Sequence, residues 1–98
     1  PNYASSINNL AQLYSTMGNF ENAEPLYVEA INIYEKVLGK NNPNYASSLN
    51  NLAQLYSTMG NFENAEPLYI EAKNIYEKVL GKQHPVYASS LNNLAQLY

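Results

Sequence analysis

The stretch that decides the fold is residues 43–84, PNYASSLNNLAQLYSTMGNFENAEPLYIEAKNIYEKVLGKQH. Residues 1–42 match it at 37 of 42 positions, and residues 85–98 repeat its first part with one change, Asn44 to Val86. A fixed period of this length indicates stacked copies of one supersecondary unit. We therefore expect repeat 1 at 1–42, repeat 2 at 43–84 and the first helix of a truncated repeat 3 at 85–98. The start on a repeat boundary, without Met, favours a piece of a longer array.

The first half of each unit has the apolar spacing of an amphipathic helix. In the second copy this spacing predicts a helix over about 45–59, with Asn44 as its N-cap and Gly60 as the left-handed residue that ends it. Its apolar positions are Tyr45, Leu49, Leu52, Ala53, Tyr56 and Met59.

The second half of the unit predicts a second helix, which Gly81 ends. Its apolar positions are Phe62, Ala65, Tyr69, Ala72, Tyr76 and Val79. Pro67 conflicts with a regular helix because proline lacks the N–H that bonds four residues back. Either this helix begins later, near Asn64, or it bends slightly at Glu63. The chain as a whole is then all-α, with five helices in the order A, B, A, B, A.

These residues resemble the tetratricopeptide repeat pattern. The resemblance rests on residues 49–56, LNNLAQLY, followed by Gly60, Phe62, Ala65, Tyr69 and Ala72, with Pro85 closing the unit. Leu49 stands where the pattern usually has Trp, and Ala53 where it usually has Gly. The 42-residue period is most similar to the long repeats of kinesin light chains. The resemblance implies a right-handed α-solenoid of antiparallel helix pairs with the A helices on its concave wall.

The same resemblance places a polar, uncharged face of the A helices on that concave wall. An extended peptide or a partner helix could be held there, because carboxamides both donate and accept hydrogen bonds. The candidate peptide-binding residues are Ser5, Asn8, Asn9, Gln12, Ser47, Asn50, Asn51, Gln54, Ser57, Thr58, Asn92 and Asn93, and Ser15, Thr16, Ser89 and Gln96 stand at equivalent positions.

Other interpretations of this face stay open. The amides could form a merely solvated surface, or the Asn side chains could brace neighbouring helices. The whole chain could also be a structural spacer whose main property is self-stacking, since both terminal helices lack a neighbour on one side. We expect self-association through these terminal faces. Family members that grip C-terminal carboxylates use Lys or Arg on the A helix, and none occurs there.

Composition argues against several other functions. The chain has a net charge of −3, no Arg and no Cys, and all its charged residues lie at 21–40 and 63–82. It has no basic track for nucleic acid and no apolar run long enough for a membrane. His84, the single histidine, lies in a loop, and the Ser pairs have no positioned base. We expect a soluble, cytoplasmic protein-interaction scaffold with no catalytic residues, no metal and no cofactor.

Overall fold

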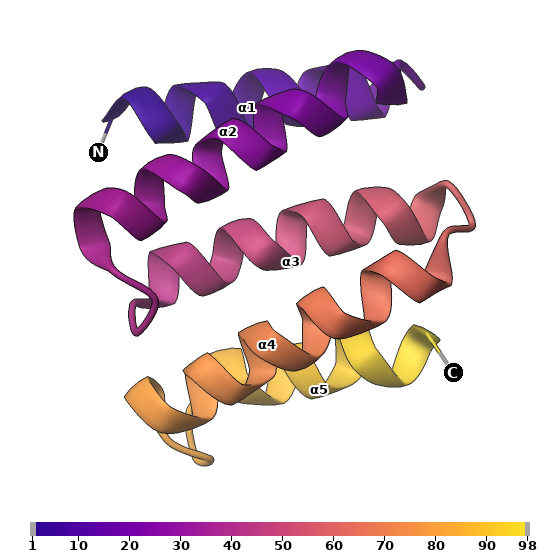
Figure 1. Ribbon diagram of the computed structural model, residues 1–98. Coiled ribbons are helices and arrows are strands. Elements are labelled where there is room, and N and C mark those ends of the chain that lie inside the picture. Colours follow the sequence, from indigo (N-terminus) through magenta and orange to yellow (C-terminus); the bar gives the residue numbers. More distant parts are fainter. Residues whose placement is uncertain (1, 98) are drawn as a thin grey trace.

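The computed structural model describes residues 2–97, which form five α-helices joined by short loops. The helices are α1 (Asn2–Thr16), α2 (Phe20–Leu38), α3 (Pro43–Thr58), α4 (Phe62–Leu80) and α5 (Pro85–Leu97). Each helix packs against the next one along the chain, and successive helices run in opposite directions (Figure 1). The predicted order of five antiparallel helices is confirmed over these residues.

The A helices begin two residues earlier than the sequence predicts. The N-cap of α3 is Asn42, whose side chain accepts a hydrogen bond from the Asn44 N–H at 2.8 Å, so the assignment of Asn44 as the cap is wrong. Pro43 is then the first helical residue. An N–H at this position would have no partner within the helix, so proline loses no hydrogen bond there. His84 has the equivalent position before α5, and its Nδ1 accepts from the Val86 N–H at 3.1 Å.

The B helices begin before their proline. Helix α4 starts at Phe62 and contains Pro67, so the predicted later start near Asn64 is wrong. Pro67 is the sixth residue of α4, so the helix loses only the hydrogen bond that an N–H at this position would donate to the Glu63 carbonyl. This bond lies at the N-terminal end of the helix, next to N–H groups that have no partner within the helix. Gly60 has a φ of +79°, as predicted for the left-handed residue that ends the A helix, and Gly81 ends α4 as predicted, with a φ of +88°.

The core is built from alternating small and large side chains where the helices cross. Ala53, Ala65 and Tyr69 pack together between α3 and α4. Tyr76 is the largest fully buried side chain in the described range, and Leu55 is the next. Burial of Leu55 was not predicted, and it arises because α3 packs against both α2 and α4. Phe62, predicted as a core position, is instead 52% exposed, and the predicted core residues Met59 and Val79 are exposed as well.

A hydrogen bond between repeats supplements this packing. The Tyr56 hydroxyl of α3 donates to Glu24 Oε2 of α2 at 2.6 Å. Burial and this hydrogen bond raise the pKa of Tyr56 to about 12, so the phenol stays protonated at neutral pH. Adjacent repeats are therefore joined by a polar contact as well as by apolar packing.

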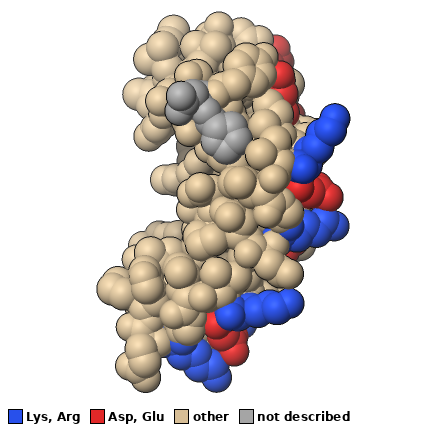
Figure 2. All heavy atoms as spheres, turned by 90° about the vertical axis from the view of Figure 1, so that its left-hand side faces the viewer, with Lys and Arg blue, Asp and Glu red and all other residues tan. Residues whose placement is uncertain are grey.

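The helices form two layers with different surfaces. The molecule measures 35 × 32 × 19 Å, and the shortest extent corresponds to about two helix diameters of roughly 10 Å. Lys and Glu occur only on α2, α4 and the loops that follow them. Figure 2 shows these charges along one side, while the opposite side is free of them and its outline is hollowed at mid-height. The hollowed side is therefore the uncharged one.

Candidate peptide-binding groove

Helices α3 and α5 flank a groove of about 460 Å³, which we call the α3/α5 groove. Its walls are polar and carry no charge. From α3 come Ser47, Asn50, Asn51, Gln54, Ser57 and Thr58, from α5 come Asn93 and Gln96, and Tyr69 of α4 completes the lining. The predicted polar faces of α3 and α5 thus border one depression.

A second depression, the α1/α3 groove, has a volume of about 240 Å³. It is lined by Gln12, Ser15, Thr16, Tyr27, Asn51, Gln54, Leu55 and Thr58. Three residues of α3, Asn51, Gln54 and Thr58, line both grooves. The two depressions therefore meet at α3 and form one surface along the A helices.

A buried tyrosine from a B helix lines each groove. Tyr27 and Tyr69 occupy equivalent places in repeats 1 and 2, and each is about 5% exposed. Their hydroxyls have no hydrogen-bond partner among residues 2–97, whereas those of Tyr34, Tyr56 and Tyr76 are all paired. Burial raises the pKa of both Tyr27 and Tyr69, so their phenols remain donors at neutral pH. Each groove thus contains an unused donor.

Each of the two full repeats also contains one buried, unused acceptor. Asn8 and Asn50 occupy equivalent positions on α1 and α3, and the Oδ1 atom of each is buried without a hydrogen-bond partner in the described part of the chain. A buried polar atom left unpaired costs about 1–3 kcal/mol. Asn50 also lines the α3/α5 groove, so a ligand bound in that groove would place its hydrogen-bond donors near Asn50.

The carboxamides do not brace the helices against one another. Within residues 2–97, no side chain of Asn8, Asn50, Asn51, Gln54 or Asn93 makes a hydrogen bond to another helix. Bracing is instead done by serine, since Ser47 Oγ lies 2.7 Å from the Tyr76 hydroxyl and Ser5 Oγ lies 3.1 Å from that of Tyr34. The amides therefore keep their hydrogen-bonding capacity for another partner.

Most of the predicted site residues meet in the two grooves. Eight line a groove, namely Gln12, Ser47, Asn50, Asn51, Gln54, Ser57, Thr58 and Asn93, and four do not, namely Ser5, Asn8, Asn9 and Asn92. The candidate set lacked Tyr27 and Tyr69, which come from the B helices. A tyrosine at an otherwise apolar B-helix position was the available signal, because its hydroxyl needs a polar partner when buried.

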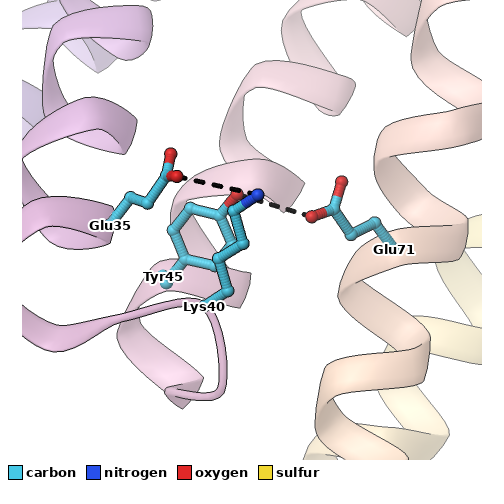
Figure 3. Close-up of polar contacts among 4 residues, drawn as sticks. All are labelled: Glu35, Lys40, Tyr45 and Glu71. Carbon is cyan, nitrogen blue, oxygen red and sulfur yellow. Dashed lines mark hydrogen bonds and ion pairs between the residues drawn. The ribbon is translucent and has the colours of Figure 1, made fainter.

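A separate polar cluster lies at the junction between the repeats. Figure 3 shows Tyr45 of α3 between Glu35 of α2 and Glu71 of α4, with Lys40 from the connecting loop. The Tyr45 hydroxyl donates to Glu71 Oε2 at 3.4 Å, and Lys40 Nζ lies 3.7 Å from Glu35 Oε2. Burial, followed by the charges of Glu71 and Glu35, raises the pKa of Tyr45 to about 12. None of the four residues lines either groove, and we assign the cluster a structural role.

No group of three or more His, Cys, Asp or Glu residues in the described range is placed to hold a metal ion. None of the helices described combines the length and apolarity that crossing a bilayer requires.

The family model of the tetratricopeptide repeat matches residues 2–77 and 57–98. A search of curated protein sequences found no match. The crystal structure of BtubC (BKLC) from P. vanneervenii is similar, with a TM-score of 0.87 and 32% identity over 97% of this chain and 37% of that chain.

Two further solved structures are of a Podosopora anserina protein, described as a kinesin light chain with nearly identical TPR-like repeats, and of its Q17M form. Each has a TM-score of 0.88 and 28% identity over 100% of this chain and 46% of that one. The chain thus spans less than half the length of these relatives. The predicted right-handed solenoid and the likeness to kinesin light chains are confirmed, and the chain belongs to the tetratricopeptide repeat family.

Proposed function

We propose that the chain is a non-enzymatic scaffold that binds an extended, uncharged peptide along its A helices. Tetratricopeptide repeats are in general protein-interaction modules. The observation that carries the proposal is an uncharged polar groove lined by Tyr69, whose hydroxyl has no hydrogen-bond partner among residues 2–97, and by Asn50, whose Oδ1 is buried and unpaired. A ligand that donates to Asn50 Oδ1 would remove a cost of about 1–3 kcal/mol, and the Tyr69 hydroxyl offers it a second hydrogen bond.

An extended peptide suits this groove better than a partner helix does. The main chain of an extended segment offers an N–H and a C=O at every residue, and carboxamides can pair with both. A helix satisfies these groups internally and would have to dock through an apolar face. Because the groove walls carry amides and hydroxyls, they favour contacts with the main chain over strong selection of side chains.

An array of immobilised peptides tests the proposal. Peptides of about twelve residues, roughly 40 Å when extended, would exceed the longest dimension of the chain, 35 Å. We expect the native chain to bind uncharged peptides, and the double variant Asn51→Ala/Gln54→Ala to bind them at least about fivefold more weakly, because each lost hydrogen bond contributes about 0.5–1.5 kcal/mol.

The matched control is Asn32→Ala/Asn74→Ala, which removes two exposed carboxamides from the B helices, outside both grooves. This control should bind as the native chain does. If both double variants bind like the native chain, or if only charged peptides are retained, the groove is not the binding site.

Self-association is a second candidate function, and a specific observation favours it. Leu10 and Leu13 of α1 are 43% and 55% exposed, whereas the equivalent Leu52 and Leu55 of α3 are 5% and 1% exposed, with α2 packed beside them. The face of α1 that corresponds to the α2-covered face of α3 is thus open. A second copy of the chain could cover this face of α1. Such a contact would join two different surfaces, so further copies could be added at each end.

Sedimentation velocity over a range of concentrations tests this second function. We expect the native 98-residue chain to associate as its concentration rises, and the variant Leu10→Gln/Leu13→Gln to remain monomeric because its exposed apolar area is removed. Val37→Gln, at a position 59% exposed on α2, is the control and should associate like the native chain. A native chain that stays monomeric at every concentration would rule out self-stacking.

A further inference from the structure

The N-caps of α3 and α5 have the same geometry but different chemistry. Asn42 caps α3 with its Oδ1 atom and His84 caps α5 with its Nδ1 atom, and each atom accepts from the backbone N–H two residues later, at 2.8 Å and 3.1 Å. The backbone carbonyl of each cap also accepts from the N–H four residues later, at 3.1 Å and 3.3 Å. The two residues therefore have one structural role, but an imidazole can take up a proton and a carboxamide cannot.

Protonation turns the imidazole cap into a donor. A neutral imidazole has one acceptor nitrogen, whereas both ring nitrogens of a protonated imidazole are donors. The Val86 N–H would then face another N–H, and the positive ring would lie at the positive end of the helix dipole. Histidine side chains change charge between about pH 5 and 8, so mild acid is enough to disrupt such a cap.

The surrounding charges do not offset this effect. Helices α3 and α5 carry no charged residue, and their tyrosines are neutral phenols in this pH range. The charged groups on the C-terminal half of α4 and on the loop that follows it are Glu71, Lys73, Glu77, Lys78 and Lys82. None of them forms an ion pair with His84 within residues 2–97, and Glu77 and Lys82 pair with each other at 3.7 Å.

Helix α5 is less able than α3 to compensate for a lost cap. It has 13 residues, of which only Ser90 is buried, whereas α3 has seven buried residues. Helices shorter than about 12–15 residues are marginal without tertiary packing. The cap therefore contributes a larger share to the order of α5 than it does to that of α3.

We propose that His84 is an acid-sensitive cap that holds the first turn of α5 at neutral pH and releases it in mild acid, while α3, capped by Asn42, does not respond. In the released turn His84 takes up a proton without losing a hydrogen bond, so protonation favours the released form. The stability that the cap contributes is therefore complete above the range in which histidine titrates, and it is lost as the pH falls through that range. Because α5 supplies Asn93 and Gln96 to the α3/α5 groove, acid would also loosen one wall of that groove.

Backbone amide exchange of the 98-residue chain, measured by NMR and corrected for the intrinsic effect of pH, tests the proposal. We expect the protection of the Ala88 N–H to fall about fivefold between about pH 7.5 and about pH 5, the factor that the loss of one N-cap corresponds to. The protection of the Ala46 N–H, which has the equivalent place in α3, should stay constant and is the internal control.

Three substitutions provide the reference states. His84→Asn copies the cap of α3 and should keep high protection of the Ala88 N–H at both pH values, whereas His84→Ala should show low protection at both. The native chain should match the first variant at neutral pH and the second in acid. Asn42→His should transfer the pH dependence to the Ala46 N–H, with a smaller fall because α3 is more deeply buried.

Two results would overturn the proposal. One is a native chain in which the protection of the Ala88 N–H changes with pH no more than it does in His84→Asn. The other is a His84→Ala chain that protects this N–H at neutral pH as well as the native chain does, since the imidazole would then not act as a cap. The measurements use no peptide, so the proposed function does not depend on their outcome.

Discussion

Replacing Tyr76 by alanine is expected to cost roughly 3–5 kcal/mol of unfolding free energy, a large share of the stability of a chain of this size. Tyr76 is 2% exposed and is the largest fully buried side chain of residues 2–97. Its ring packs in the main core cluster, and its hydroxyl lies 2.7 Å from Ser47 Oγ. The substitution therefore leaves a cavity and an unpaired serine in the same place.

Urea denaturation followed by circular dichroism measures this loss. Tyr76→Phe keeps the ring and should cost only about 0.5–1.5 kcal/mol, the usual contribution of one hydrogen bond. Val79→Ala, at an exposed position on the same helix, should change the midpoint little. Equal midpoints for Tyr76→Ala and Tyr76→Phe would show that the ring does not fill the core.

Enlarging Ala53 to leucine is expected to cost about 1–3 kcal/mol, because a crowded core must shift to admit the added atoms. Ala53 is fully buried beside Ala65 and Tyr69, where α3 and α4 cross. Small residues at this crossing allow the two helix backbones to approach closely. A larger side chain would push α4 away and displace Tyr69, which lines the α3/α5 groove.

The chain supplies a matched control for this substitution. Ala95 has the same place in its repeat as Ala53, but it is exposed on α5. Thermal unfolding should show Ala53→Leu well below the native chain and Ala95→Leu close to it. If the two variants unfold at the same temperature, contact with the next helix does not determine burial at this position.

The helices were predictable because the repeat period and the apolar spacing are both local signals. The start of α3 was misplaced by two residues because both Asn42 and Asn44 suit a cap, and only the path of the chain selects Asn42. The spacing of apolar residues predicts that Phe62 is a core residue. Phe62 is exposed because the spacing shows which side of a helix is apolar, but it does not show how much of that side the neighbouring helix covers.

The groove was half predictable for a similar reason. Asn51 and Gln54 lie on the polar face of one helix, so the sequence alone places them together. Tyr69 comes from a different helix and reaches the α3/α5 groove only through the packing of α4 against α3. Its unpaired hydroxyl, like the buried Oδ1 of Asn50, becomes apparent only when the neighbouring helices are in place.

The most direct test of the account is an NMR titration of the side-chain amides with an uncharged peptide of about twelve residues that the array retains. The account predicts that the amide signals of Asn51, Gln54 and Asn93, which line the grooves, shift together, while those of Asn32 and Asn74 on the B helices stay in place. Shifts confined to Asn32 and Asn74 would contradict it, and so would a full titration that moves none of these signals.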